Sequence, residues 1–337
     1  MIRFGLVGFG LHGVRRLMPG FALAKKCQVT ALARRDIAKA CASAAEYNIP
    51  QAFASTEELC ASPDVDAVLV TSPDAFHLRD TLTAISHGRP VLCEKPMAMN
   101  AAECRQMVEA ARAANVLLGV AHVFRFEEST HWFREQLAAG TIGRPVYARS
   151  EFCYQVHGHG RRWLTDATLA AGGPIADVGV HCVDALRFVL QDEVIRVTAR
   201  AATDEQSGAV EATGLLTLEF SRGTPGTVIV STRASYRTPL EIVGDGGVLQ
   251  ANDALTVDRP VEMRLLRDGK APEVITVNNH EAYARQVDAF AEAIRGVAQF
   301  PVPGEVGWQN QEILDAVYRS VKSGRAEEVA QVNVLDR

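Results

Sequence analysis

The stretch IRFGLVGFGLHG, residues 2–13, decides the fold. Residues 2–7 form an apolar run that predicts a buried strand, and a helical pattern follows the glycines of G-x-G-x-x-G. Gly8 allows a tight turn, Gly10 lets the backbone approach a pyrophosphate, and Gly13 allows close packing of helix on strand. This succession predicts a dinucleotide-binding turn rather than a coincidence of glycines. Its predicted cofactor contacts are Gly8, Phe9, Gly10, Leu11, His12 and Gly13.

Strand and helix patterns alternate through the first 120 residues. Ser55 and Asn100 each stand three residues before a glutamate, which is the signature of a capped helix start. Repeated strand–helix–strand units predict an α/β fold with a doubly wound parallel sheet, so we assign residues 1–121 to an NAD(P)-binding Rossmann domain. Pro19 and Gly20 interrupt the first helix, and we expect it to kink or end early there.

The pattern changes after residue 121. A helix is predicted over residues 129–139, and mostly strand-like runs with turns fill residues 194–277. Two helices close the chain near residues 283–295 and 308–323. We therefore expect residues 122–337 to form a substrate-binding and oligomerisation domain of the α+β class, with an open, mostly antiparallel sheet.

The composition of the chain excludes several classes of protein. Its 337 residues are 47% hydrophobic and 22% charged, with a net charge of −5 and no basic block, which argues against nucleic-acid binding. No apolar run approaches the roughly 18 residues of a membrane span, and the first ten residues lack the pattern of a signal peptide. The seven scattered cysteines fit a reducing compartment. We expect a cytoplasmic protein.

The end of the second predicted strand bears on the choice of dinucleotide. An acidic residue there binds the ribose of NAD, whereas arginine suits the 2′-phosphate of NADP. Here the strand ends at Ala33, and Arg34 and Arg35 precede Asp36. We predict that Arg34 and Arg35 contact NADP, the preferred cofactor, with NAD as the second choice. The alternative is a solvated helix start with Asp36 as its cap.

Two more motifs lie at the carboxyl ends of predicted strands, where ligands bind in this type of sheet. They are TSPDAFH, residues 71–77, and CEKP, residues 93–96. In the first, Asp74 can cap the next helix, and His77 is more typical of a structural residue than of a catalytic one. In the second, Lys95 can serve as a catalytic donor, although a lone lysine there is more often solvated. The predicted cofactor contacts in these motifs are Thr71, Ser72, Pro73, His77, Glu94 and Lys95.

The segment GGPIADVGVHCVD, residues 172–184, places ionisable side chains at helical spacing. Asp177 and His181 are four residues apart, so they share one face of a helix and can point into one cleft. Asp184 follows three residues later and could orient the imidazole of His181 or serve as a structural acid. A histidine alone would be interpreted as a satisfied core residue.

Taken together, these motifs resemble those of the NAD(P)-dependent oxidoreductase family of glucose-fructose oxidoreductase, inositol dehydrogenase and MocA (Gfo/Idh/MocA), over nearly the whole chain. The family's third motif begins with three glycines, and Ala171 replaces the first of them here. The resemblance implies that Lys95, Asp177 and His181 converge on the nicotinamide as catalytic residues, and that Asp177 and His181 also contact substrate. It places residues 121–126 near the site, so His122 is a further substrate candidate.

The segment CYQVHGHGRRWL, residues 153–164, contains His157-x-His159, a spacing that invites a metal interpretation. No second ligand pair has suitable spacing, and we expect no metal. We interpret the segment as a glycine-containing loop over the substrate. Arg161, Arg162 and Trp163 would then contact the substrate or the nicotinamide half of the cofactor, and a solvated loop is the alternative.

The implied reaction is reversible hydride transfer between the nicotinamide and a hydroxyl-bearing carbon of a sugar, polyol or related hydroxy or keto compound. His181 would act as general acid and base, because an ordinary histidine pKa near 6.5 suits that task. Lys95 would donate to the developing oxyanion. Asp177 would hold the substrate hydroxyl or tune Lys95. The substrate, the direction of the reaction and the group that moves the proton stay open.

Two alternatives to a dehydrogenase remain. One is cofactor-assisted glycoside cleavage through transient oxidation, and the other is a non-catalytic, dinucleotide-sensing regulator. The complete set of Lys95, Asp177 and His181 favours an enzyme. Open sheets in the family that the sequence resembles commonly pair between subunits, which implies a homodimer or homotetramer.

Overall fold

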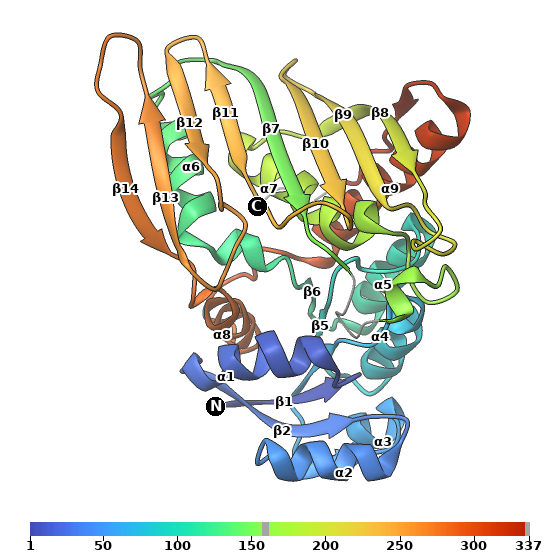
Figure 1. Cartoon of the computed structure of the whole chain (residues 1–337). Coiled ribbons are helices and arrows are strands. Elements are labelled where there is room, and N and C mark those ends of the chain that lie inside the picture. The colour runs from blue at the N-terminus through green and yellow to red at the C-terminus, as the bar shows by residue number, and fades with distance from the viewer. Residues whose placement is uncertain (157–161, 334–337) are drawn as a thin grey trace.

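The computed structural model describes residues 1–156 and 162–333 of the chain. Within these residues two sheets form, a parallel one in the N-terminal half and a larger one in the rest of the chain. In Figure 1 the larger sheet spans the upper part of the molecule and the N-terminal half lies below it. No helix in the described ranges has both the length and the apolar character that crossing a membrane requires.

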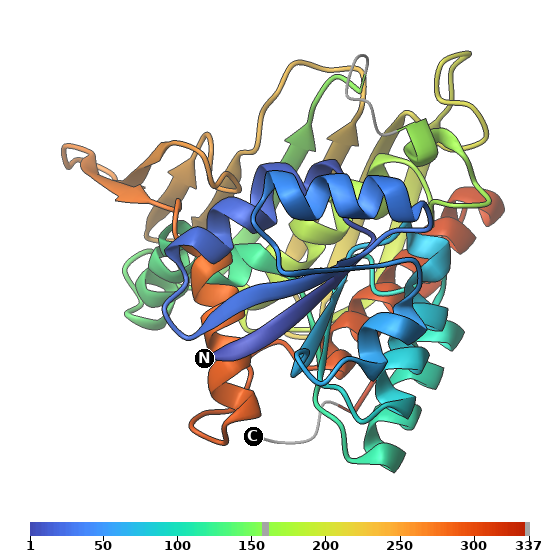
Figure 2. The same ribbon diagram turned by 90° about the horizontal axis from the view of Figure 1, so that it is seen from below.

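The N-terminal sheet is parallel throughout and has the strand order β3-β2-β1-β4-β5-β6. This is the doubly wound arrangement that the sequence predicts. In Figure 2 its first strands (blue) lie among helices that cover both faces. The strands are β1 (Ile2–Val7), β2 (Cys27–Ala33), β3 (Gln51–Phe53), β4 (Ala67–Val70), β5 (Val91–Cys93) and β6 (Leu118–Val120). The helices are α1 (Met18–Leu23), α2 (Ile37–Glu46), α3 (Thr56–Ala61), the short η2 (Asp74–Phe76), α4 (His77–Ser86) and α5 (Ala101–Ala114).

The caps of α3 and α5 follow the sequence prediction, because Ser55 and Asn100 each accept a hydrogen bond from a backbone N–H three residues later. Of the two outcomes expected at Pro19 and Gly20, the early end is not found, and the kink stays a prediction. A π-helical turn, η1 (Gly13–Leu17), precedes α1, and the helix continues through Pro19 to Leu23. Proline lacks an amide donor and clashes with the carbonyl four residues before it, so a wider turn before Pro19 lets the helix continue.

The larger sheet has the order β14-β13-β12-β11-β7-β10-β9-β8-β15. It is antiparallel except between β7 and β10, which confirms the predicted open, mostly antiparallel sheet. Buried and exposed residues alternate along β9, so one face is covered and the other is open. The strands are β7 (Pro145–Cys153), β8 (Val194–Ala202), β9 (Thr213–Phe220), β10 (Pro225–Ser231), β11 (Leu240–Gly244), β12 (Gly247–Ala251), β13 (Pro260–Leu266), β14 (Glu273–Asn278) and β15 (Glu327–Glu328).

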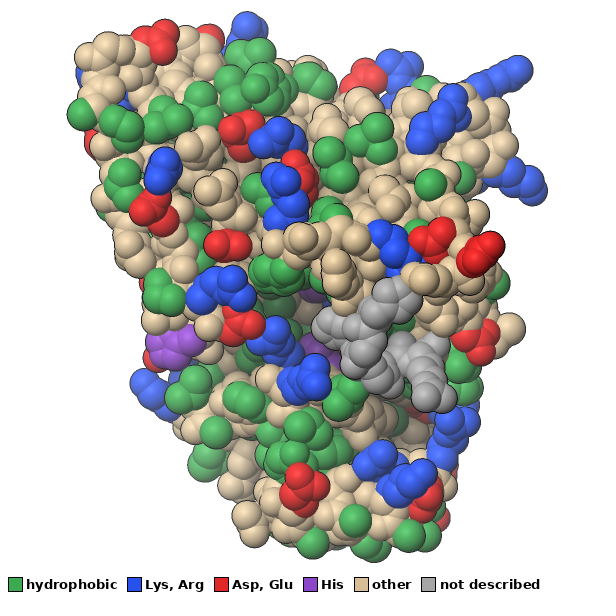
Figure 3. All heavy atoms as spheres, viewed as in Figure 1, with side chains coloured by type: hydrophobic (Ala, Val, Ile, Leu, Met, Phe, Trp, Pro, Cys, Tyr) green, Lys and Arg blue, Asp and Glu red, His purple; other side chains and the backbone are tan. Residues whose placement is uncertain are grey.

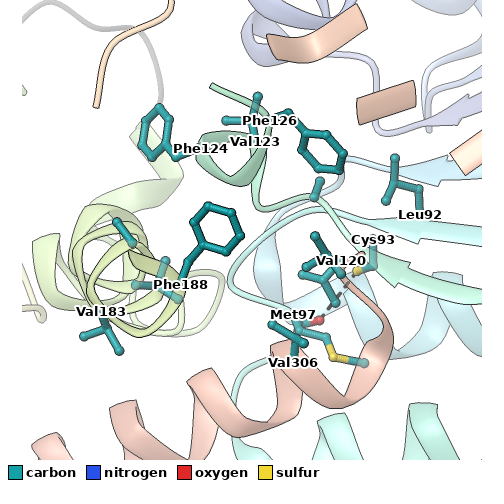
Figure 4. Packing of buried hydrophobic residues seen from close by; sticks show 14 of the residues in the cluster. Leu92, Cys93, Met97, Val120, Val123, Phe124, Phe126, Val183, Phe188 and Val306 are labelled. Carbon is teal, nitrogen blue, oxygen red and sulfur yellow. Dashed lines mark hydrogen bonds between the residues drawn. The ribbon is translucent and has the colours of Figure 1, made fainter. Parts of the chain in front are cut away.

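The helices of the C-terminal part link the two sheets. α8 packs on α1 and α9 packs on α5, so the end of the chain returns to the parallel half. Figure 4 shows the resulting core, where Val120 at the end of β6 lies near Val306 of α9 and Phe188 of α7. The two domains that we propose therefore share one apolar core. The elements not yet given are η3 (Val123–Phe126), α6 (Glu128–Ala138), η4 (Arg162–Thr165), η5 (Ile175–Gly179), α7 (Val180–Leu190), α8 (Ala282–Ile294) and α9 (Gly304–Ser323).

Candidate active site

The glycine-rich turn after β1 closes tightly onto the end of β4. Gly8 has a φ of +87°, and a β-carbon there would lie 2.4 Å from the backbone nitrogen of Ser72. The Thr71 hydroxyl lies 3.0 Å from the carbonyl oxygens of both Val7 and Gly8 and donates to them. At Gly10 a β-carbon would meet only a carbonyl oxygen at 3.7 Å, so the backbone there is open to a ligand. A pyrophosphate needs such an opening.

A cavity of about 660 Å³ runs along the ends of the parallel strands. Open backbone, cationic side chains and an aromatic surface in its wall fit an NAD(P) cofactor. Gly13 is not in the wall of this cavity. A β-carbon there would lie 3.0 Å from the Phe9 ring, so this glycine allows close packing instead. The predicted cofactor residues that line the cavity are Gly8, Phe9, Gly10, Leu11, His12, Arg34, Arg35, Thr71, Ser72, Pro73, His77, Glu94 and Lys95.

Arginines gather at the far end of this cavity. Arg34 donates a hydrogen bond to the Ser43 hydroxyl at 2.7 Å. The guanidinium groups of Arg35 and Arg79 lie 5.6 and 4.7 Å from the centre of the Phe76 ring. Guanidinium groups that stack on an aromatic ring keep their N–H edges available for a phosphate. Sequence reasoning found Arg34 and Arg35 but missed Phe76, which lies inside the motif of residues 71–77, and Arg79, which lies two residues beyond it.

Asp36 is used as a helix cap. Its carboxylate accepts a hydrogen bond from the backbone nitrogen of Lys39 at 3.1 Å, which begins α2. This hydrogen bond stabilises the carboxylate form and lowers the pKa of Asp36. Ser55 and Thr56 also line the cavity and were missed. They follow β3, so the strand-end rule that singled out Thr71 could have found them.

The turn after β5 is joined to the glycine-rich turn. Nε2 of His12 lies 2.8 Å from a carboxylate oxygen of the buried Glu94. Burial raises the pKa of Glu94, but the neighbouring His12 and Lys95 outweigh it, and the pKa is lowered. Glu94 therefore ties together two motifs that are 82 residues apart in the chain.

His77 joins the turns after β4 and β5. Its Nδ1 lies 2.9 Å from the carbonyl oxygen of Pro96, and its Nε2 lies 2.8 Å from that of Ser72. A carbonyl can only accept, so both nitrogens must donate, which requires the imidazolium form. Burial opposes this charge, but Cys93, Asp74 and the Ser72 carbonyl outweigh it and raise the pKa of His77 to about 10. His77 thus has the structural role that the sequence favours, on the wall of the cofactor cavity.

A second cavity, of about 550 Å³, adjoins the first. Figure 3 shows a hollow between the two halves of the molecule, with histidine (purple) visible inside it and Lys and Arg side chains (blue) at its edge. His12, Glu94, Lys95 and Asp177 line both cavities. A dinucleotide in one and a small molecule in the other would meet at these residues.

Lys95 and Asp177 are in direct contact where the cavities meet. Nζ of Lys95 donates to the carbonyl oxygen of Asp177 at 2.8 Å and lies 3.4 Å from its carboxylate Oδ1. Only 12% and 9% of these two side chains are exposed. The Tyr154 hydroxyl donates to Asp177 Oδ2 at 2.6 Å, and nothing in the spacing of the sequence singles out this tyrosine.

His181 lines the second cavity beside this pair, with its ring centre 4.4 Å from that of Phe124. Burial, together with the charge of Lys95 and the nearby His122, lowers the pKa of His181 well below its ordinary value. The expectation of an ordinary pKa is therefore wrong, and the imidazole is neutral at physiological pH. Nδ1 is buried and has no hydrogen-bond partner within the described ranges, which leaves Nε2 for a substrate.

One prediction about the neighbours of His181 is wrong, and for the other the structure favours one of the two alternatives. His122 does not reach the cleft but is buried behind His181, where its Nε2 accepts from the Asn310 amide at 2.9 Å. Burial lowers the pKa of His122 to about 4. Asp184 fits the alternative of a structural acid rather than a partner of His181, because Arg125 donates to both of its carboxylate oxygens at 2.7–3.1 Å. These buried groups form a network beneath the site, outside the cavity.

Trp163 lines the first cavity and not the second, so the structure places it beside the cofactor site. His157, His159 and Arg161 lie outside the described residues, and of Arg162 only the backbone, in η4, is described. Over the described residues no cluster of three or more His, Cys, Asp or Glu side chains could hold a metal ion.

Comparisons with known proteins agree with this geometry. Residues 2–122 match the family described as "Oxidoreductase family, NAD-binding Rossmann fold", and residues 130–250 match the "GFO/IDH/MocA C-terminal domain". A 1,5-anhydro-D-fructose reductase of Ensifer adhaerens is 32% identical over 98% of this chain and 99% of its own length. The chain belongs to the Gfo/Idh/MocA family. Like its family, it is an NAD(P)-dependent oxidoreductase.

Other Gfo/Idh/MocA relatives extend over nearly the full chain. A D-xylose 1-dehydrogenase (NADP(+)) of Haloferax volcanii is 31% identical, covering 97% of this chain and 99% of that protein. The crystal structure of an aldose-aldose oxidoreductase from Caulobacter crescentus has a TM-score of 0.90 at 24% identity, covering 97% and 99% of the two chains. The last comparison shows a common fold.

Proposed function

We propose that this oxidoreductase transfers a hydride between NADP and a hydroxyl-bearing carbon of a sugar, polyol or related hydroxy or keto compound. The observation that carries the proposal is the junction of two cavities at Lys95 and Asp177, with His181 on the wall of the second. The relatives named for anhydrofructose and xylose support a sugar-like substrate.

The bound nicotinamide supplies or accepts the hydride, and side chains of the protein manage the proton on the substrate oxygen. We assign proton transfer to Lys95, because the lowered pKa of His181 prevents that imidazole from holding a proton at neutral pH. In reduction Lys95 gives a proton to the oxygen as the carbonyl carbon gains the hydride, and in oxidation it takes the proton back. Nε2–H of neutral His181 donates a hydrogen bond to a substrate oxygen, because the buried Nδ1 has no acceptor within the described residues and is the unprotonated nitrogen. Asp177 holds Lys95.

The preference for NADP rests on the charges at the far end of the first cavity. Arg35 and Arg79 both stack on Phe76 there. Arg79 already donates to Asp80 through Nε and Nη2 at 3.0 and 2.7 Å, so we assign the phosphate contact to Arg35. Asp36 is the acid nearest to the position that binds the ribose of NAD. Its carboxylate instead caps α2 by accepting a hydrogen bond from the backbone nitrogen of Lys39. Fluorescence titration with NADPH and NADH tests this proposal: tighter binding of NADPH is expected, and equal or tighter binding of NADH would contradict it.

A panel of aldoses, inositols and keto sugars, assayed with the preferred cofactor, tests the reaction. The expected result is a net change in reduced cofactor with at least one sugar or polyol. Relatives named as reductases and dehydrogenases favour this outcome over glycoside cleavage or a regulatory role. Absence of any net cofactor turnover across the panel, in both directions, would contradict the proposed function.

The state of assembly and the compartment are also proposals. The outer face of the large sheet exposes apolar side chains, including Leu215 at 48% and Val146 at 46%, which supports a homodimer or homotetramer formed through this face. All seven cysteines are free thiols and all lie in the described residues, which supports a reducing compartment such as the cytoplasm.

A further inference from the structure

We propose that Tyr154 is a positioning residue, whose hydroxyl fixes the Asp177 carboxylate so that Lys95 is held ready for proton transfer. This inference rests on the proposed function and assigns a role to a residue that is not among the predicted site residues. Tyr154 is 7% exposed and lines the second cavity together with Lys95 and Asp177.

Two donors approach different oxygens of the Asp177 carboxylate. Tyr154 donates to Oδ2 at 2.6 Å, while Oδ1 faces Lys95 Nζ at 3.4 Å. A hydroxyl–carboxylate distance of 2.6 Å is typical of a charge-assisted hydrogen bond, which is stronger than one between neutral groups. Without the hydroxyl, the carboxylate loses a donor at Oδ2 and with it part of the constraint that orients Oδ1 toward Lys95.

The three groups come from three elements, so their arrangement depends on the tertiary fold. Lys95 follows β5 of the parallel sheet, and Asp177 lies in the π-helical turn η5. Tyr154 directly follows β7, and its backbone nitrogen donates to the carbonyl oxygen of Ser231 at 2.9 Å. This backbone bond extends the pairing of β7 with β10 and gives the tyrosine a rigid base.

The hydroxyl also affects the charge of the pair. Hydrogen bonds to a carboxylate favour its ionised form, so Tyr154 helps Asp177 to stay negative beside Lys95. Most of the carboxylate is withdrawn from water, so a lost donor is replaced only in part by solvent. Removal of the hydroxyl should therefore affect the chemical step more than the binding of either ligand.

Tyr154→Phe tests the proposal, since it keeps the ring and removes only the oxygen. We expect kcat to fall roughly 10- to 100-fold, while KM for the best sugar and Kd for NADPH change less than about threefold. The acid limb of the kcat profile should move to higher pH, because the carboxylate has lost a donor. Wild-type kcat with an unmoved acid limb would overturn the proposal.

Tyr318→Phe is the matched control. Tyr318 is a second tyrosine that donates to a carboxylate, that of Glu211 at 3.2 Å, and it lines neither of the two cavities. We expect this control to change thermal stability without moving the pH profile. If the two variants have the same kcat and pH profile, Tyr154 has only a structural role and the proposal is wrong.

Two further measurements keep the test decisive if turnover is not found or if Tyr154→Phe does not fold. In the apo protein, ¹³C-aspartate NMR, assigned with Asp177→Asn, should show Asp177 titrating at higher pH in Tyr154→Phe than in wild type.

A fluorinated tyrosine at position 154 keeps the size of the side chain but has a more acidic phenol. Because a more acidic phenol is a stronger donor, the Asp177 titration should move to lower pH than in wild type, opposite to the shift in Tyr154→Phe. Unchanged titrations in both would overturn the positioning role, whereas an unproductive sugar panel alone would overturn only the proposed function.

Discussion

Lys95 receives its position from its neighbours. Its Nζ makes two contacts with Asp177: it lies 2.8 Å from the carbonyl oxygen and 3.4 Å from the carboxylate Oδ1. A lysine side chain carries three N–H donors, so one remains for a substrate oxygen at the junction of the two cavities. The contact with Asp177 therefore orients the free donor.

Lys95→Ala should remove this donor and leave the cofactor site nearly intact. We expect kcat to fall at least about 10²- to 10³-fold, as for the loss of one group that stabilises a developing oxyanion. Kd for NADPH, measured by fluorescence titration, should change only a few-fold. Unimpaired turnover in Lys95→Ala would contradict the assignment of proton transfer to Lys95.

His77 should carry a positive charge throughout the physiological pH range. Both of its ring nitrogens face carbonyl oxygens, and its pKa is raised to about 10. ¹⁵N NMR of labelled histidine, assigned with His77→Phe, should show two protonated nitrogens at neutral pH. Because the folded pKa is raised, the stability that this charge adds is complete below the unfolded pKa near 6.5 and is lost as pH rises toward about 10. A neutral tautomer at pH 7 would contradict this interpretation.

At the scale of residues, the sequence predicts which side chains lie together when local motifs carry them. The motifs bring Lys95, Asp177 and His181 onto one cavity, although no measurement yet tests their roles. The partners of Asp184 could not be predicted, because Arg125 and Asn310 stand 59 and 126 residues away. The same limit applies to the pKa of His181, since burial against Phe124 depends on the tertiary structure.

The junction of β2 and α2 should control the choice of cofactor. Arg35 is exposed and stacks on Phe76, so its loss leaves the core unchanged. Arg35→Glu should weaken NADPH binding roughly 10- to 100-fold by removing a cation and adding a negative charge near the 2′-phosphate. NADH binding should change much less. Arg15→Glu is the control, because Arg15 is exposed and lines neither cavity, and it should leave the binding of both cofactors unchanged. Equal losses of both cofactors in Arg35→Glu would contradict a phosphate contact.

The start of η5 should tolerate no side chain at Gly173. A β-carbon there would lie 2.0 Å from the backbone carbonyl oxygen of Glu211, which cannot move like a flexible side chain. We expect Gly173→Ala to lower the free energy of unfolding by about 1–3 kcal/mol, measured by urea denaturation. Gly10→Ala is the control: its β-carbon faces the cofactor cavity, so stability should hold while cofactor binding weakens. Equal stability of Gly173→Ala and wild type would contradict this steric account.

At the scale of elements, the sequence predicted where capped helices begin but not the π-helical turns within helices. The caps at Ser55 and Asn100 are local hydrogen bonds that three residues of spacing specify. The π-helical turns η1 and η5 were not predicted, because a single extra residue in a turn leaves the apolar periodicity almost unchanged. For this reason the helix through Pro19 was expected to kink or end early, and the early end is not found.

The whole molecule presents one broad open sheet face, which we expect to be an interface between subunits. Leu215 lies on this face and is 48% exposed. Leu215→Lys should convert the dimer or tetramer to a monomer, measured by light scattering after size-exclusion chromatography, because a buried lysine without a partner is costly. Val297→Lys, at a 67% exposed apolar residue after α8, is the matched control and should leave the assembly unchanged. A monomeric wild-type protein would contradict the expected interface.

At this largest scale the order of patterns along the chain was sufficient to predict both sheets. Alternating strands and helices produce the parallel sheet, and the run of strands after residue 194 produces the antiparallel one. The return of α8 and α9 to the parallel half could not be predicted, since an amphipathic helix does not specify which sheet it covers. The shared core in Figure 4 follows from that return.

The π-helical turn over Ile175–Gly179 makes the site sensitive to the length of the chain as well as to its composition. Deletion of one residue just after Asp177 could relax the turn to an ordinary α-helix while α7 keeps its place. Asp177 would then be rotated by about 100° around the helix axis, away from Lys95. Insertions and deletions at this position should therefore be removed by selection more strongly than conservative substitutions, so a gap there in an alignment would mark a relative with different chemistry.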